Sequence, residues 1–242
     1  LFLPVPGGIH LSGRSLREAA SRVDMYLPHA VRISPFYMAS TVVTKEQFDR
    51  FLRSRPEWAD RAAVIEAGNA SEGYLEGWEE LAADAPATGV PYHAAEAFAG
   101  WMTDSLPPTL RARMEVRLPT EAEWEWAASG AGVQNNPPDE AVFLGSPPDA
   151  PPSANRLGLT GLWGGVWEWC SDWYYPAANL LHRSTIREDP PYPLMTGSEK
   201  VVKGGSWANR RDEIELWTRG SQPPSWNTPY TGFRVVLAER RP

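Results

Sequence analysis

The chain has 242 residues, of which 42% are apolar and 22% charged, a composition typical of a globular protein with a substantial core and not of a disordered chain. The formal net charge of −7 leaves no basic stripe that could contact phosphates, which argues against nucleic acid as the main partner. No apolar run reaches the roughly 18 residues that a membrane-spanning helix needs, so no membrane span is expected.

The N-terminal part predicts short strands followed by a helix. Strands are expected at residues 1–11, with a turn at 6–8, and at 28–38, interrupted by Pro35, with a loop at 12–27 between them. Thr44 and Gln47 form a capping-box pattern. This pattern predicts a helix that places Phe48 and Phe51 on one face and ends before Pro56.

The middle of the chain predicts two further helices of moderate length. Residues 57–90 suggest one short helix and then loop, and apolar residues at helical spacing indicate a helix over 93–104. Residues 116–118 resemble a short strand. Thr120 and Glu123 form a second capping box, which starts a helix that closes at Gly130.

The second half of the chain predicts strands and turns. Residues 131–154 and 174–199 are expected to be loops, and 201–203 and 232–237 to be strands. The 24 prolines and 20 glycines predict much irregular structure, which the 12 tryptophans would hold by aromatic packing. Three helices among short irregular strands, without an internal repeat, predict a single α+β domain over residues 1–242.

The side chains that most often carry catalysis are present, but not in recognisable sets. Glu121, Glu123 and Glu125, like Glu79 and Glu80, lie in helical patterns and are expected to be exposed to solvent and not catalytic. The histidines have no partner at i+2 or i+4, so metal binding would need the fold to bring two of them together; they are His10, His29, His93 and His182. No nucleophile elbow, phosphate-binding loop or dinucleotide-binding glycine set is found.

The single cysteine, Cys170, forms no internal disulfide. Between tryptophans of a predicted strand, it fits a small buried apolar group better than a nucleophile. One cysteine fits a reducing compartment as well as a disulfide-free periplasmic protein. The chain opens at Leu1 without Met, as it would after removal of a signal or lipid-attachment segment. An extracytoplasmic location, periplasmic or at the cell surface, is slightly favoured.

Four tryptophans lie within eleven positions and form what we call the Trp ridge: Trp163, Trp167, Trp169 and Trp173. In a strand, the last three would lie on one face. The simpler interpretation is that these rings pack in the core. The alternative is that they form the floor of a pocket whose wall is the glycine-rich turn at 203–207 (KGGSW).

The segment from Trp207 to Tyr230 has a different character, because it mixes aromatic, arginine and amide side chains that dominate binding surfaces. The candidate ligand-binding residues are Trp207, Asn209, Arg210, Arg211, Glu213, Trp217, Trp226 and Tyr230. The alternative is a structural ion-pair network beneath the loop, formed by Arg219, Asp212 and Glu213. Both interpretations stay open.

Several motifs together resemble the formylglycine-generating enzyme, or sulfatase-modifying factor, family. In chain order they are RLPTEAEWE at 117–125, VWEW at 166–169, GGSW at 204–207 and GFR at 232–234. The resemblance runs nearly from end to end and implies an elaborated C-type-lectin-like fold. Members that generate formylglycine bind copper through two cysteines, three and eight residues after the serine of the GGS motif.

The copper-binding pair is missing from this sequence. The serine is Ser206, and the two positions hold Asn209 and, nominally, Ile214. Because Cu(I) requires soft thiolate ligands, the resemblance makes copper unlikely as a cofactor here. A calcium ion of the family would be bound by Glu168 and the carbonyl oxygens of Gly164 and Val166. Gly161 replaces its Asn or Asp ligand, so calcium is expected to be weak at most.

Relatives of this kind include iron-dependent oxidases, surface or periplasmic proteins, regulators of partner proteins, and ligand-binding proteins that vary between the GGSW and GFR motifs. We therefore predict a non-catalytic domain that binds a protein or another ligand through residues 207–230 and the Trp ridge. The alternative is a metal-dependent oxidase with an altered metal site, which would use Ser206, Trp167 and a histidine. A purely structural surface domain is the third hypothesis.

Overall fold

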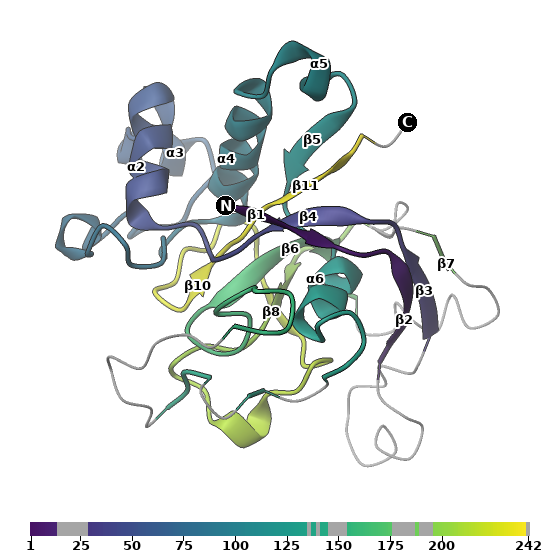
Figure 1. The fold of residues 1–242 in the computed structure, drawn as a ribbon. Helices are drawn as coiled ribbons and strands as arrows, with labels where there is room; N and C mark the ends of the chain where they lie inside the picture. The colour runs from purple at the N-terminus through teal and green to yellow at the C-terminus, as the bar shows by residue number, and fades with distance from the viewer. Residues whose placement is uncertain are drawn as a thin grey trace.

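The computed structural model describes residues 1–13, 29–134, 137–138, 141–144, 154–175, 187–188 and 196–240. Three small sheets form the framework of this described part (Figure 1), with the strand orders β1-β4-β11-β5, β10-β6-β8-β9 and β2-β3-β7. Together with the helices they make the α+β domain that the sequence predicts.

The sheet strands are short, as expected for a chain rich in glycine and proline. Their bounds are β1 (Phe2–Val5), β2 (Gly8–Ser12), β3 (His29–Ile33), β4 (Phe36–Ala39), β5 (Met114–Arg117), β6 (Trp167–Trp173), β7 (Arg187–Glu188), β8 (Lys200–Lys203), β9 (Gly220–Gln222), β10 (Thr231–Gly232) and β11 (Val236–Glu239). The interruptions predicted at 6–8 and at Pro35 both occur. They send β1 and β4 into one sheet and β2 and β3 into another.

The turn between β1 and β2 needs glycine for a steric reason. A Cβ at Gly8 would lie 2.5 Å from Cζ2 of Trp126, which is far inside van der Waals contact. The Trp126 indole nitrogen also donates to the carbonyl of Pro6 at 2.7 Å. The turn is therefore packed directly against an aromatic side chain more than 100 residues away in the sequence.

The helices begin where the capping patterns predict. Their bounds are α2 (Lys45–Ser54), α3 (Arg61–Glu66), α4 (Tyr92–Asp104), α5 (Pro108–Arg111) and α6 (Glu121–Ala128), with short 3-10 turns η1 (Pro56–Trp58), η2 (Trp78–Glu80) and η4 (Arg211–Glu213). Both capping boxes are confirmed, at Thr44 with Gln47 and at Thr120 with Glu123. Among the described residues no helix is both long and apolar enough to cross a bilayer.

The closing strand predicted at 232–237 is wrong as one element. β10 pairs with β6 in one sheet, and β11 pairs with β4 and β5 in another. Three consecutive residues between them, Phe233, Arg234 and Val235, are all buried. This segment, which buries every side chain, passes through the core without forming a strand as it connects the two sheets, which a two-residue alternation does not predict.

Two clusters of buried apolar residues make the core. One surrounds α6 and contains Trp163, and the other contains Trp169 and packs α2 and α4 against β5 and Phe233. The second cluster is aromatic at its centre, where the Phe98 ring lies 5.3 Å from the Phe233 ring and 5.7 Å from the Phe51 ring. Most of the loop predicted at 12–27, most of the loop at 174–199, and His182 lie outside the described residues, as does much of 131–154.

Candidate functional site

The Trp ridge is mainly core. The Trp169 side chain is fully buried, and its indole nitrogen donates to the carbonyl of Val90 at 3.0 Å. The Trp163 ring packs against Trp124 with their centroids 6.2 Å apart. Trp167 is half-buried and contacts both apolar clusters. These positions support the simpler of the two interpretations, in which the rings stabilise the fold.

The GGSW turn lies directly on the loop that precedes β6. Gly164 donates to the carbonyl of Gly204 at 2.8 Å, and Trp207 donates to the carbonyl of Gly165 at 2.9 Å. Gly204 and Gly205 have positive φ angles of 96° and 77°, which L-residues rarely adopt. A Cβ at Gly205 would also lie 2.7 Å from the Ile214 side chain. The turn is therefore fixed by backbone bonds and close packing.

The two positions that the family resemblance assigns to copper-binding cysteines have structural roles. The Asn209 side-chain oxygen accepts hydrogen bonds from the backbone N–H of Ser206 at 2.9 Å and from its hydroxyl at 3.0 Å. Ile214 is buried against Gly205. An amide that closes a turn and an apolar core residue supply no thiolate, so this donor set does not fit copper.

The only cysteine of the sequence, Cys170, is far from a reactive state. It is completely buried, and this burial, together with the nearby carboxylates of Asp172 and Glu121, raises the pKa of its thiol well above the usual value. A protonated thiol is neither a good nucleophile nor a metal ligand. The sequence-based interpretation of Cys170 as a small apolar residue agrees with this environment.

Glu168, the central residue of the predicted calcium site, forms a buried ion pair with Arg234. The guanidinium donates to both carboxylate oxygens, at 2.7 and 2.8 Å, and the Trp124 indole nitrogen donates at 2.8 Å. Arg234 also donates to the carbonyls of Ala39 and Thr160. A guanidinium thus lies where a cation bound by Glu168 would have to lie. Calcium at Glu168, Gly164 and Val166 stays a prediction that this pairing disfavours.

The carboxylates of α6 are buried, so their predicted exposure is wrong. Each meets a basic side chain from another element, and together they form a buried ionic network: Glu121 with Arg219 at 2.7 Å, Glu123 with Arg117 at 2.7 Å, and Glu125 with Lys203 at 2.8 Å. Burial acts to raise the pKa of Glu125, but Lys203 and His10 outweigh it, and the pKa lies well below its usual range. Glu79 and Glu80 are exposed, as predicted.

The sequence held one signal for this burial. Ala122, Trp124, Trp126 and Ala127 occupy positions around the whole circumference of α6, so no polar face remains for three carboxylates. A helix that is apolar on all sides is buried, and buried carboxylates need partners. The partners lie between 6 and 98 residues away in the sequence, and this pairing is what the sequence alone did not reveal.

The segment after Ser206 divides into structural and exposed residues. Arg219 belongs to the buried ionic network through Glu121, which supports the structural interpretation for that residue. Trp217 is half-buried and donates to Glu215 at 2.6 Å. Arg210 and Asp212 form an exposed ion pair at 2.9 Å. Burial and pairing are thus concentrated in the middle of the segment.

Three of the exposed residues are large aromatics, and we call them the aromatic face: Trp207, Trp226 and Tyr230. Their exposed fractions are 48%, 52% and 40%. The rings of Trp207 and Tyr230 contact each other, with centroids 5.1 Å apart. Of the other predicted binding residues, Arg211 donates to the carbonyl of Pro137 at 2.8 Å, and Glu213 accepts from the backbone of Arg210.

Comparisons with known proteins agree with this architecture. The sequence model of the Sulfatase-modifying factor enzyme 1-like domain matches residues 2–239. The chain is 29% identical over 238 residues to the serine/threonine-protein kinase Pkn1 of Chlamydia trachomatis serovar L2. This alignment covers 86% of this chain and 34% of the kinase. It is 27% identical over 290 residues to the formylglycine-generating enzyme of Streptomyces coelicolor, covering 96% of this chain and 87% of that protein.

The fold likewise resembles a solved structure. PvdO from Pseudomonas aeruginosa matches with a TM-score of 0.72 and 18% sequence identity, over 98% of this chain and 93% of that one. The chain spans about a third of the length of the curated kinases that it matches.

Proposed function

The chain belongs to the family of sulfatase-modifying factor enzyme 1-like domains, and from this premise we propose that it is a non-catalytic member that binds a protein or another ligand. The proposed binding surface is the aromatic face together with the neighbouring polar residues of 207–230. In this proposal the Trp ridge supports the surface from below through the GGSW turn.

The observation that carries the proposal is the chemistry at the two copper positions. Asn209 closes the turn at Ser206, and Ile214 fills the space beside Gly205. Both residues stabilise the start of the segment on which the aromatic face lies. In this proposal, the two positions that hold copper-binding cysteines in formylglycine-generating members therefore support a surface loop in this chain.

The exposure of the aromatic face supports the same conclusion. Trp and Tyr side chains are enriched at the energetic centres of interfaces, because each ring provides a large contact area at a low entropic cost. Hydrogen bonds fix the backbone that carries these rings. The side-chain oxygen of Asn227, for example, accepts from the backbone and the hydroxyl of Ser71, at 3.0 and 2.7 Å. A rigid backbone with exposed rings suits recognition.

A binding experiment tests this proposal. Ligands recovered by the purified protein from a displayed peptide library and a carbohydrate array are measured again with Trp207→Ala, Trp226→Ala and Tyr230→Ala. We expect a loss of at least about 2 kcal/mol in binding free energy for one or more of these variants. Tyr37→Ala is the matched control, because Tyr37 is 45% exposed on β4. Equal binding by all four variants would contradict the proposed surface, and recovery of no ligand by the wild-type protein would favour a purely structural domain.

The competing hypothesis is a metal-dependent oxidase with an altered metal site near Ser206 and Trp167. Ser206 is 1% exposed and its hydroxyl donates to Asn209, so the turn would have to open before the hydroxyl could reach a substrate. Metal analysis and oxygen uptake separate the two proposals. Stoichiometric copper or iron, lost together with oxygen uptake in His93→Ala or another histidine variant, would establish the oxidase and remove the binding proposal.

A further inference from the structure

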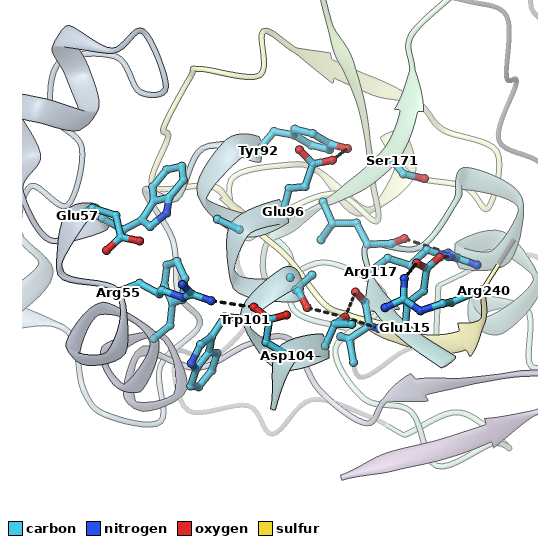
Figure 2. Close-up of a pocket in the computed structure, with 18 of the residues that line it drawn as sticks. Arg55, Glu57, Tyr92, Glu96, Trp101, Asp104, Glu115, Arg117, Ser171 and Arg240 are labelled. Atoms are coloured by element: carbon cyan, nitrogen blue, oxygen red, sulfur yellow. Dashed lines mark hydrogen bonds and ion pairs between the residues drawn. The ribbon is translucent and has the colours of Figure 1, made fainter. Parts of the chain in front are cut away.

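A cleft with a volume of about 680 Å³ runs along one face of α4 (Figure 2). On this face, residues at helical spacing line it, among them Tyr92, Glu96, Ala99, Gly100 and Thr103. A Cβ added at Gly100 would meet nothing within 4 Å. The cleft thus exists where the helix lacks side-chain bulk. It contains no residue of 207–230, so it is separate from the proposed binding surface.

The charges of the cleft are not balanced in pairs. Its lining has four carboxylates and three guanidinium groups. Every guanidinium is already engaged: Arg55 with Asp104 at 2.8 Å, Arg117 with Glu123 at 2.7 Å, and Arg240 with Glu115 at 3.6 Å. Within the described part of the chain, no basic side chain forms an ion pair with Glu57 or Glu96. The cleft therefore has negative charge to spare and no guanidinium to offer an anion.

Oxygen atoms gather at one side of the cleft. The Tyr92 hydroxyl donates to Glu96 at 3.2 Å, and Figure 2 shows these two groups facing each other. Ser171 also lines the cleft, but its hydroxyl oxygen is buried. A carboxylate and a hydroxyl oxygen are acceptors for the N–H groups of an ammonium or guanidinium ion.

The ammonium group of Lys200 lies next to the cleft but does not neutralise the negative charge of its lining. The Lys200 ammonium donates to the carbonyl of Ser171 at 2.7 Å and lies 4.4 Å from the Tyr92 ring centroid. It interacts electrostatically with both Glu96 and Asp172, so two carboxylates share one ammonium. Trp58 and Trp101 also line the cleft and offer aromatic surface for an alkyl chain or a cation.

We propose that this cleft binds an organic cation, an ammonium or guanidinium group on an apolar stem. The charged head lies at Glu96 and Tyr92, and the stem lies along Ala97 and Gly100. Such a group is found on free small amines and on the basic side chains of peptides. The chemistry recognised is the same for both.

Calorimetric titration of the whole chain with two probes tests the proposal and separates the sources. The probes are agmatine, which is a free guanidinium on an alkyl chain, and a capped Ala-Arg-Ala peptide. We expect saturable binding that weakens as salt is raised, because the contact is ionic. Tighter binding of agmatine indicates a small amine, and tighter binding of the peptide indicates a basic side chain; 1-butanol should not bind.

Two variants locate the site. Glu96→Gln should weaken agmatine binding about tenfold, the usual effect of losing one charge-assisted contact. Gly100→Leu should abolish binding by filling the cleft, while the helix gains propensity and the fold is retained. Glu79→Gln is the matched control, because Glu79 is exposed and lies outside the cleft.

Three results would overturn the proposal. They are no saturable binding of either probe to the wild-type chain, equal binding of 1-butanol and agmatine, and unchanged binding in a folded Gly100→Leu variant. Unfolding of that variant would show in circular dichroism. Ala97→Leu, at a neighbouring cleft position that is only partly buried, then gives the same test.

Discussion

The region around α6 and the segment after Ser206 differ in how their charges are paired. In the first, carboxylates with almost no solvent exposure each contact a basic side chain from another element, up to 98 residues away in the sequence. In the second, the Arg210–Asp212 pair is about two-thirds exposed on both sides and joins residues two positions apart. Long-range buried pairs tie the fold together, whereas short-range exposed pairs leave their segment free to differ in sequence. This difference explains how a fold can retain its buried ion pairs while the residues of its exposed segment change.

The largest effect is expected at Glu168. Glu168→Leu leaves the buried Arg234 guanidinium without its carboxylate, and the free energy of unfolding should fall by about 3–5 kcal/mol. Urea unfolding measures this loss. Asp212→Leu, which breaks the exposed pair with Arg210, should leave stability nearly unchanged, because solvent screens an exposed ion pair. Similar losses in both variants would remove the contrast between the two regions.

The second prediction concerns the pH dependence around Asp172. Burial and the neighbouring Glu121 and Glu123 raise the pKa of Asp172 to about 6, against opposition from the Glu121 backbone N–H and Arg219. Since the pKa in the folded state lies above the ordinary aspartate value of 3.8, ionisation of this carboxyl disfavours the folded state. Asp172 therefore reduces stability progressively as the pH rises from about 4 to about 6.

Asp172→Asn removes this charge and should raise the free energy of unfolding by about 1–3 kcal/mol at pH 7. Below pH 4, where the wild-type carboxyl is protonated in both states, the variant should have no advantage. Urea unfolding at pH 4, 5, 6 and 7 follows the difference. A variant advantage that stays constant across this range would show that Asp172 does not titrate as described.

An intermediate effect is expected at Asn209. Asn209→Ala leaves the backbone N–H and the hydroxyl of Ser206 without their shared acceptor, which should cost about 1–2 kcal/mol. Asn209→Asp keeps an acceptor oxygen and should recover most of this loss. Thermal unfolding of the two variants gives the comparison. If Asn209→Ala is as stable as the wild type, the turn does not depend on this side chain.

The smallest effect on stability is expected on the aromatic face. Trp226→Ala removes a ring that is already 52% exposed, and surface changes of this kind usually shift stability by no more than about 0.5 kcal/mol. Chemical denaturation of the variant checks this. A loss as large as that in Glu168→Leu would mean that the ring belongs to the framework and not to a binding surface.

Local patterns predicted the beginnings of elements well. Thr44 with Gln47 and Thr120 with Glu123 each satisfy backbone groups within four residues, so the sequence contains all the information needed. Pro35 likewise separates β3 from β4, because proline lacks the N–H that a continuous strand would use. The lack of the copper-binding thiols was also visible, since it depends only on residue identity.

What the sequence did not reveal depends on contacts between distant residues. The burial of Glu121, Glu123 and Glu125 requires Arg219, Arg117 and Lys203, which no periodicity links to α6. The crossing at Phe233 to Val235 depends on two sheets whose relative position is a tertiary property. The α4 cleft was missed for a further reason, because an empty volume is formed by small residues and leaves no motif.

Arg234 makes the order of synthesis matter for this domain. Its guanidinium joins the carbonyls of Ala39 and Thr160 to the carboxylate of Glu168, and β11 then completes the sheet that contains β1 and β4. A nascent chain that ends before residue 234 has Glu168 without its partner and that sheet without a central strand. Such a chain lacks contacts that the native state needs, so folding of this domain cannot be completed before residues 234–239 have been synthesised.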